Sequence, residues 1–304
     1  MLLRVLGAAA GGGLPQWNCA CINCRAARGP EPTILPRTQS QIAVSGDGES
    51  WYLLNASPDL RQQLMTFEKA HPSLDRGIRN TPIAGAILTS ADLDHTLGLL
   101  LLREFTPVRI YSTSAVHQIL SANPFFRMLN RLPGQEQWNI IEDEVPLHLE
   151  GGLQITPVKL EGSAPAYALE RMPDGTMNND FVLGLLIQGQ SGKRVAYFPA
   201  LPVLDQHIRT IFESCDVILV DGTFWSETEL QKLQTGTQGA TQMGHLPIDG
   251  ESGSLKFLRG LSGVRRVYTH INNTNPILDQ TTAAYKTVAK AGCEIAFDGL
   301  EICF

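Results

Sequence analysis

The chain has 304 residues, of which 43% are hydrophobic and 18% charged, and its formal net charge is -6. This length and composition allow a large buried core in a globular protein. The negative charge, with no basic cluster longer than Arg265-Arg266, argues against a nucleic-acid surface, and the apolar runs are too short to span a membrane.

The N-terminal residues predict a first β-strand rather than a signal peptide. One arginine and a row of alanines superficially resemble a signal, but Arg4 lies inside the apolar run of residues 2–6 and no basic region precedes it. We therefore expect a cytoplasmic protein.

A cluster of three cysteines follows at residues 19–24. Cys19, Cys21 and Cys24 have the spacing Cys-x-Cys-x-x-Cys, whereas the other three cysteines lie apart in apolar contexts. Clustered thiols without an export signal indicate metal binding rather than disulfides, and three thiolates on one loop need one more ligand for a tetrahedral zinc site. The alternative, that these cysteines only pack in the core, is disfavoured by the neighbouring asparagines.

Strands and helices are predicted along the whole chain, which we treat as a single domain over residues 1–304. Short strands are expected at residues 2–6, 41–45, 51–55, 83–88, 108–111, 153–158, 181–187, 195–198, 217–221, 264–270 and 293–297. Helices are expected at residues 57–67, 95–104, 113–121, 202–214, 226–233, 251–261 and 276–291. The pattern fits two sheets covered by outer helices, and a doubly wound α/β fold would show the same pattern.

Three of the predicted strands end in residues that can bind a metal. The run at residues 83–88 is followed by a turn containing Asp94 and His95, the strand at 217–221 ends at Asp221, and the last long strand ends at His270. Two histidines and a carboxylate with open positions form the ligand set of non-haem Fe(II) oxygenases, and zinc also accepts these ligands. The alternative for the first turn is a helix N-cap made by its serine and aspartates.

The turn at Ser90, Asp92, Asp94 and His95 resembles the His-x-His-x-Asp-His motif of the metallo-β-lactamase superfamily. Ser90 and Asp92 stand where two histidines belong, and residues 157–167 lack the third histidine of that second metal site. The resemblance implies one metal site held by Asp94 and His95 together with Asp221 and His270. A second ion would have to use Asp92 and Glu161, which are oxygen ligands.

Taken together, motifs along most of the chain resemble the pyrroloquinoline quinone (PQQ) biosynthesis protein B family. They are Gly11-Gly12-Gly13-Leu-Pro15-Gln-Trp17-Asn-Cys19, Leu54-Asn55-Ala56-Ser57-Pro58-Asp59, Ser90-x-Asp92-x-Asp94-His95, Asp221-Gly-Thr-Phe-Trp225, Met243-Gly-His245-x-Pro247-Ile248 and Thr269-His270-Ile-Asn-Asn273-Thr274-Asn275-Pro276. This resemblance implies a metallo-β-lactamase-like αββα four-layer sandwich with two mixed sheets.

The resemblance also implies a role in making PQQ from a small peptide-derived precursor that contains glutamate and tyrosine. The family is described as a carrier of PQQ toward the periplasm and as an iron-dependent hydroxylase of the tyrosine ring that uses O2. We rank the Fe(II) hydroxylase first, a mononuclear zinc hydrolase second and the carrier third. Other proteins of the PQQ pathway and a second copy of the chain, in a homodimer, are further candidate partners.

Two further sets of residues receive roles through the resemblance. Relatives with a similar cysteine loop use a histidine where this chain has Asn273, which makes Asn273 a candidate fourth ligand of a structural zinc site, with His245 as the alternative. His245 and Ser90 are otherwise expected to contact the substrate or to support the metal ligands, and Lys159 is a second candidate for binding substrate carboxylates.

Overall fold

The structure, a computed structural model, describes residues 1–104, 106–131, 133–169, 180–234 and 236–304. It contains two compact units. Unit 1 comprises Met1–Leu6, Gln41–Gly192 and Gly299–Phe304, and unit 2 comprises Gly7–Ser40 and Lys193–Asp298. Each unit thus combines segments that lie far apart in the sequence. The single-domain organisation expected above stays a prediction.

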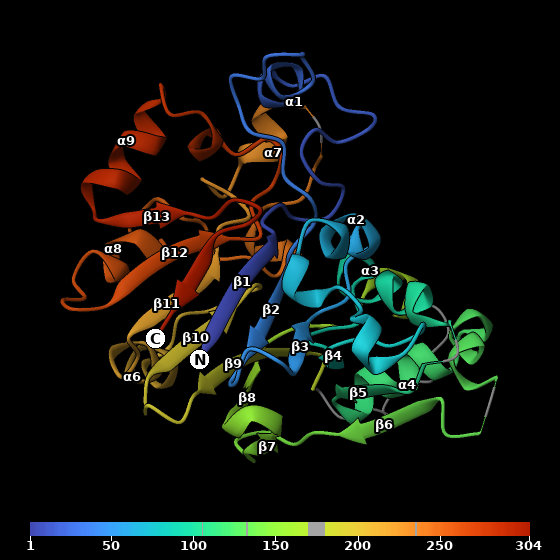
Figure 1. Cartoon of the computed structure of the whole chain (residues 1–304). Helices are drawn as coiled ribbons and strands as arrows, with labels where there is room; N and C mark the ends of the chain where they lie inside the picture. Colours follow the sequence, from blue (N-terminus) through green and yellow to red (C-terminus); the bar gives the residue numbers. More distant parts are fainter. Residues whose placement is uncertain (105, 132, 170–179, 235) are drawn as a thin grey trace. The chain divides into compact units, whose positions relative to one another are not determined.

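Seven strands of the described part of unit 1 form a mixed sheet in the order β14-β1-β2-β3-β4-β5-β6 (Figure 1). They are β1 (Leu2–Gly7), β2 (Gln41–Ser45), β3 (Trp51–Leu54), β4 (Ile83–Ile87), β5 (Val108–Ser112), β6 (Glu136–Ile140) and β14 (Glu301–Cys303). The pairs β1–β14 and β2–β3 are antiparallel, whereas β3 to β6 run parallel. Every residue of β2 and β3 is buried, which agrees with their apolar sequences.

The helices of unit 1 are short, and some of them bury apolar side chains in the core of this unit. They are α2 (Leu60–Met65), α3 (Leu93–Thr96), α4 (Ser114–Ser121) and α5 (Ala166–Leu169), with the 3-10 helices η1 (Glu68–Ala70), η2 (Leu74–Arg76), η3 (Leu97–Leu102), η4 (Pro124–Asn130) and η5 (Glu150–Gly152). In the core, the rings of Trp51 and Phe67 meet edge to face with centroids 4.7 Å apart. Truncating either ring to alanine would cost about 3–5 kcal/mol of stability.

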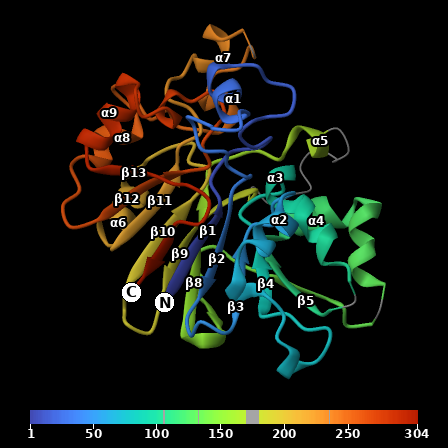
Figure 2. The ribbon, with the colours of Figure 1, turned by 45° about the horizontal axis from the view of Figure 1, so that its top comes forward.

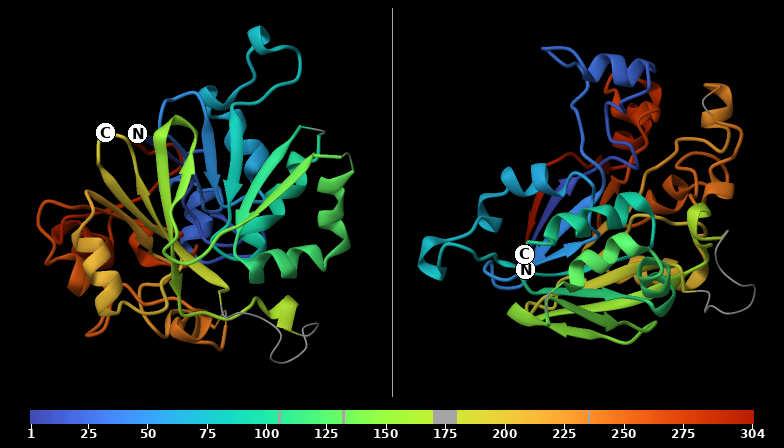
Figure 3. Two further views of the ribbon diagram at one scale, coloured as in Figure 1. Left: turned by 90° about the horizontal axis from the view of Figure 1, so that it is seen from below. Right: turned by 90° about the vertical axis from the view of Figure 1, so that its right-hand side faces the viewer.

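Unit 1 also contains three antiparallel strands, β7 (Leu147–Leu149), β8 (Leu153–Leu160) and β9 (Val182–Gln188), drawn in green to yellow in Figure 3. β8 pairs along its whole length with β9, from Gln154 opposite Gln188 to Leu160 opposite Val182. Buried side chains alternate with more exposed ones in the first half of β8, as expected for a strand with one covered face.

Unit 2 contains the parallel strands β10 (Arg194–Phe198), β11 (Val217–Asp221), β12 (Arg265–Thr269) and β13 (Cys293–Ile295), which lie side by side in this order (Figure 2). In this register Asp221 lies opposite Thr269 at the carboxyl ends of β11 and β12. Parallel strands therefore bring the end of β11 close to His270, which directly follows β12.

The helices of unit 2 are short. They are α1 (Ile22–Ala27), α6 (Gln206–Glu213), α7 (Glu229–Lys232), α8 (Ser254–Leu258) and α9 (Ala283–Lys290), with η6 (Thr241–Met243) and η7 (Pro276–Leu278). Asp205 caps α6 through a 2.8 Å bond from the Ile208 amide, so the helix begins after Pro202 and the two apolar residues that the sequence suggested as its start. No helix within the described residues is long and apolar enough to cross a membrane.

Candidate metal centres

The turn after β4 is held in place by neighbouring segments of unit 1. The Thr89 amide donates to Asn55 Oδ1 at 2.8 Å, and the Thr89 carbonyl accepts from the Leu183 amide at 2.8 Å. Asn55 itself is fully buried and adopts a left-handed φ of 68°. These bonds fix the position of residues 90–95 at the carboxyl end of a buried strand.

Ser90 determines which nitrogen of His95 carries the proton. Ser90 Oγ donates to Asp92 Oδ2 at 2.7 Å and lies 2.8 Å from His95 Nδ1. Because the hydroxyl has a single hydrogen, it accepts the bond from His95, and Nδ1 is the protonated nitrogen. The lone pair of the imidazole is then on Nε2, the arrangement that supports a metal-binding histidine.

The carboxylate of Asp92 does not cap the following helix. Asp92 is the N-cap residue of α3, but it makes no side-chain cap bond and instead accepts from Ser90. Asp94 Oδ2 lies 3.9 Å from His95 Nε2, and the side chains of these two residues are 14% and 2% exposed. The side chain of Asp92 therefore does not have the helix-capping role that was the alternative to metal binding.

Tyr167 lies against the same turn. Its hydroxyl donates to the Ala91 carbonyl at 2.5 Å. Burial and the nearby charge of Asp92 raise the pKa of Tyr167 to about 12, so the hydroxyl stays protonated and keeps donating. Tyr167 belongs to the short helix α5, and a single tyrosine gives no sequence signal for this role.

The other candidates in this region lie in a separate cavity of unit 1. Lys159 and Glu161 line a cavity of about 680 Å³ together with Asp143 and Phe181, and none of the residues of the turn lines it. Glu161 is thus not placed with Asp92, as a second metal ion would require.

Asp221 is the centre of a hydrogen-bond network in unit 2. Its Oδ1 accepts from the Thr223 amide at 2.9 Å and the Thr223 hydroxyl at 2.7 Å, and its Oδ2 accepts from the Leu201 amide at 2.9 Å and lies 2.7 Å from His245 Nδ1. A carboxylate offers about four lone-pair sites. Asp221 therefore fixes its neighbours in this arrangement, and it would bind a metal directly only by releasing one of these partners.

Thr223 holds His270 in the same way as Ser90 holds His95. Thr223 Oγ1 lies 2.8 Å from His270 Nδ1, and its single hydrogen donates to Asp221 or to the His270 carbonyl, 2.9 Å away. The hydroxyl accordingly accepts from Nδ1, which leaves the lone pair of His270 on Nε2. His270 has a left-handed φ of 53° and is buried.

His245 lies beside His270 rather than at the cysteine loop. The two rings are stacked with centroids 5.4 Å apart, and atoms of Asp221, His245 and His270 that could bind a metal lie within 4.8 Å of one another. This placement favours the role of His245 as a supporting residue and not as a fourth ligand for the cysteines.

Asp221 remains ionised although it is almost completely buried. Burial alone would raise the pKa of its carboxyl, but His245, His270 and the Thr223 hydroxyl lower the pKa below its ordinary value. The buried negative charge is therefore stabilised by the histidines and the hydroxyl around it.

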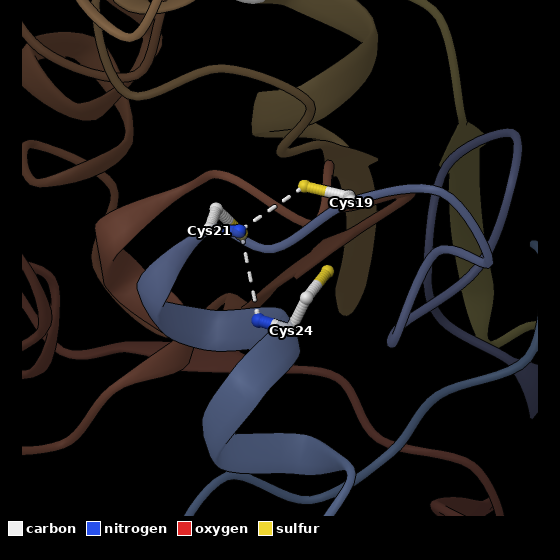
Figure 4. Close-up of side chains that lie close together, drawn as sticks. All are labelled: Cys19, Cys21 and Cys24. Atoms are coloured by element: carbon white, nitrogen blue, oxygen red, sulfur yellow. Dashed lines mark hydrogen bonds between the residues drawn. The ribbon is translucent and has the colours of Figure 1, made fainter.

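The three cysteines converge at the start of α1 (Figure 4). The Cys21 amide donates to Cys19 Sγ, and the Cys24 amide donates to Cys21 Sγ, both at 3.4 Å. Burial raises the pKa of Cys21 to about 11, whereas hydrogen bonds from Cys21, Cys24 and Asn273 lower that of Cys19 despite its burial. The sequence suggested a loop here, but Cys24 is buried inside a short helix.

Asn273 completes this cluster. Its Nδ2 lies 3.2 Å from the sulfurs of both Cys19 and Cys24 and 3.7 Å from that of Cys21. The two ends of an amide are assigned from such contacts, and half a turn would place Oδ1 toward the sulfurs instead. In the described part of the chain, no histidine or carboxylate joins the three sulfurs. The amide thus occupies the position of the fourth ligand suggested by the sequence.

Comparison with known proteins supports this reading of the fold. Residues 50–271 match the Beta-lactamase superfamily domain. Coenzyme PQQ synthesis protein B of Methylococcus capsulatus is 44% identical over 307 residues, and that of Pseudomonas putida is 42% identical over 306 residues; each alignment covers 99% of both chains.

Solved structures agree with these relatives. The crystal structure of Zn²⁺-bound PqqB from Methylobacterium extorquens has a TM-score of 0.87 and 35% identity, covering both chains completely. A diphosphatase of the PhnP family, with a TM-score of 0.65 and 19% identity over 100% of this chain and 97% of that one, shares the fold. The expected α/β fold with two mixed sheets is thereby confirmed. The chain therefore belongs to the coenzyme PQQ synthesis protein B family of the metallo-β-lactamase superfamily.

Proposed function

We propose that this protein is a metal-dependent oxygenase of PQQ synthesis, which hydroxylates the tyrosine ring of a precursor derived from glutamate and tyrosine. Membership of a family named for coenzyme PQQ synthesis supports the pathway. The observation that carries the enzymatic reading is the shared tautomer of His95 and His270. In both histidines a hydroxyl accepts from Nδ1, so that Nε2 is prepared for a metal.

We propose that one metal ion is held by Asp94, His95 and His270, with Asp221 and Asp92 completing or tuning the site. This assignment takes the pairing of the strand ends from the family resemblance. The donor set fits the ion, because imidazole and carboxylate ligands suit Fe(II), with Zn²⁺ as the alternative. A carrier of PQQ would gain little from two histidines with fixed tautomers.

The metal, when bound, would supply the redox chemistry that lets O2 react with the aromatic ring. Insertion of one oxygen atom leaves the other to be reduced to water, which takes two electrons from an external reductant. The protein's own groups hold the ligands in place: Ser90 and Thr223 fix the imidazoles, and the buried charge of Asp221 orients His245. His245 and Ser90 are the proposed contacts to substrate or to the ligands.

Three features belong to this proposal as expectations. The partners are the peptide-derived precursor, O2 and other proteins of the PQQ pathway, with a second copy of the chain as a candidate. The cysteine cluster holds a structural zinc ion, in keeping with the zinc-bound relative. The cytoplasmic location expected from the sequence stays a prediction.

The decisive experiment is anaerobic reconstitution of metal-free protein with Fe(II) or Zn(II). Oxygen uptake and the mass of a Glu-Tyr-derived precursor would then be measured in the presence of a two-electron reductant. We expect O2 to be consumed only with Fe(II), and we expect the mass of the precursor to increase by the mass of one oxygen atom for each hydroxylation. The variants Asp94→Ala and His270→Ala should lose this activity, whereas His148→Ala, which removes an exposed histidine of β7, should keep it.

Two outcomes would replace the proposal. Turnover with zinc and without O2 would indicate a mononuclear zinc hydrolase. Tight binding of PQQ or its precursor, with no oxygen uptake under any metal, would indicate a carrier.

A further inference from the structure

The loop at residues 270–275 contacts both the cysteine cluster and the turn after β11. This loop follows β12 and ends at η7, and all three regions belong to unit 2. Its first residue is the proposed ligand His270, and its fourth is Asn273, which lies over the three sulfurs. The loop is therefore a direct covalent connection between the two candidate metal centres.

Asn23 attaches this loop to the cysteine helix. It lies in α1 between Cys21 and Cys24 and is 2% exposed. Its Nδ2 donates to the carbonyls of Asn273 at 3.0 Å and Asn275 at 2.9 Å. These two bonds join the cysteine helix directly to the backbone of the loop.

Asn275 attaches the same loop to the turn after β11. It is fully buried, and its Nδ2 donates to the carbonyl of Gly222 at 2.9 Å and to that of Thr223 at 3.3 Å. The Asn272 amide adds a bond to the Thr223 carbonyl at 3.1 Å. Thr223 in turn holds the side chains of Asp221 and His270.

A buried glutamate supports the middle of the loop. Glu229 accepts from the Thr274 hydroxyl at 2.5 Å and from the Trp225 amide at 2.7 Å. Several hydrogen bonds therefore join the loop to the turn, and neither can shift alone without leaving buried polar groups unsatisfied, which is unfavourable.

We propose that Asn23 and Asn275 are positioning residues that couple the cysteine metal site to His270 and Asp221, so that loading the cysteines with zinc tightens metal binding at the second site. The proposal rests on the proposed function, because it requires that His270 binds a metal. Zinc would draw the three sulfurs together and fix α1, and Asn23 would pass this order to the loop. Coupling between two binding sites typically changes affinity by about 5–150-fold, and it acts equally in both directions.

The first test compares the unaltered chain with its cysteine site empty and with this site loaded with zinc. Co(II) serves as the probe of the second site, since its visible spectrum separates imidazole and carboxylate ligands from thiolates. We expect Co(II) to bind the second site several-fold more tightly in the zinc-loaded protein. Equal affinity in both forms would overturn the coupling, whereas no Co(II) binding at the second site in either form would overturn the proposed function.

The second test uses variants of the connecting residues. Asn23→Ala and Asn275→Ala should keep binding zinc at the cysteines but lose most of the effect of that zinc on Co(II) affinity. Asn18→Ala removes an exposed asparagine of the same cysteine loop and should behave as the unaltered chain. If Asn275→Ala does not fold, the coupling is still tested by Asn23→Ala and by the comparison of the unaltered chain with and without zinc at the cysteines. Full coupling in Asn23→Ala would contradict the role of Asn23.

Discussion

Hydroxyl groups decide which nitrogen of each candidate histidine can bind a metal. The hydroxyls of Ser90 and Thr223 have one hydrogen each. Ser90 donates its hydrogen to Asp92, and Thr223 donates its hydrogen to Asp221 or to the His270 carbonyl. The hydroxyl oxygen is then left to accept from Nδ1. In the proposed metal site, Ser90 would therefore support the ligand His95 rather than bind the metal itself.

Replacing Thr223 by valine should weaken metal binding at the second site. Valine has nearly the same shape but removes the acceptor for His270 Nδ1 and a donor to Asp221. Mutations of such supporting groups typically cost about 10–100-fold in metal affinity. Co(II) titration of the folded protein measures the loss, and Thr223→Ser should restore most of the affinity. Unchanged binding in Thr223→Val would show that the tautomer is fixed by other contacts.

Replacing Asn273 by histidine should strengthen zinc binding at the cysteines. The amide already lies 3.2 Å from two sulfurs, and an imidazole there would complete a common tetrahedral zinc set of three cysteines and one histidine. Asn273→Leu, of similar size, should bind zinc less tightly than the unaltered chain. Competition with a chromogenic chelator ranks the three proteins. The opposite ranking would place the fourth ligand elsewhere.

Asp298 should make stability depend on pH in mildly acidic solution. Burial raises the pKa of its carboxyl, in spite of bonds from Thr38 and Ala8 that lower it. Between its ordinary pKa and the raised one, the folded chain therefore holds a proton that the unfolded chain releases. The contribution of Asp298 to stability must then fall as pH rises through this interval, and it is constant above it.

Chemical unfolding at several pH values measures this effect. The difference in the free energy of unfolding between the unaltered chain and Asp298→Asn should decrease with rising pH over that interval. Asp75→Asn, which changes an exposed carboxylate, is the control. A difference that rises with pH would show that the bonds to Thr38 outweigh burial.

At the scale of elements, the packing of η3 determines where the turn with Asp94 and His95 lies. The Gly98 amide bonds to the Ala56 carbonyl at 2.8 Å, and a Cβ on Gly98 would lie 2.2 Å from the Ser57 carbonyl oxygen. Gly98→Ala should therefore push the helix away and destabilise the fold by about 1–3 kcal/mol. Thermal unfolding tests this, with Gly29→Ala as the control, since a Cβ there is 3.9 Å from its nearest neighbour. Equal melting temperatures would refute the contact.

The sequence predicted best the strands that are fully buried, because such strands consist mostly of apolar residues. β11 was predicted with its bounds, because every residue of Val217–Asp221 is buried. β6 was missed, because this edge strand is half exposed and reads Glu-Gln-Trp-Asn-Ile. β14 was missed because three residues carry too little pattern, and its pairing with β1 joins the two ends of the chain. Predicted helices were too long where caps such as Asp205 begin them later.

The candidate site could be predicted from the sequence where a residue type by itself indicates metal binding. Aspartate and histidine at strand ends, and cysteines at close spacing, indicated the candidate ligands. The supporting groups carry no such signal: Thr223, Asn23 and Tyr167 are residue types found everywhere, and only the fold brings them to a ligand. A helix was expected to begin at residue 276. Asn275 caps the 3-10 helix η7 that begins there, but its bonds to the turn after β11 required the structure.

For the whole molecule, metal stoichiometry tests whether the two units share one ion. Unit 1 offers Asp94 and His95, unit 2 offers His270 with Asp221, and the cysteines form a separate group. If the ligands of both units hold one ion, metal-free protein should take up two ions per chain, one of them at the cysteines. Independent binding by each unit would give three.

Single variants make this count decisive. With a shared ion, His95→Ala in unit 1 and His270→Ala in unit 2 should each remove the same ion, and the double variant should lose nothing more. The double variant Cys19→Ala with Cys24→Ala should remove only the ion at the cysteines. Because a ligand that binds only the folded state at 100 times its Kd adds about 2.7 kcal/mol of stability, melting temperature can follow each loss alongside metal analysis. Additive losses from His95→Ala and His270→Ala would mean that each unit binds its own metal, and the assignment of one shared catalytic ion would fail.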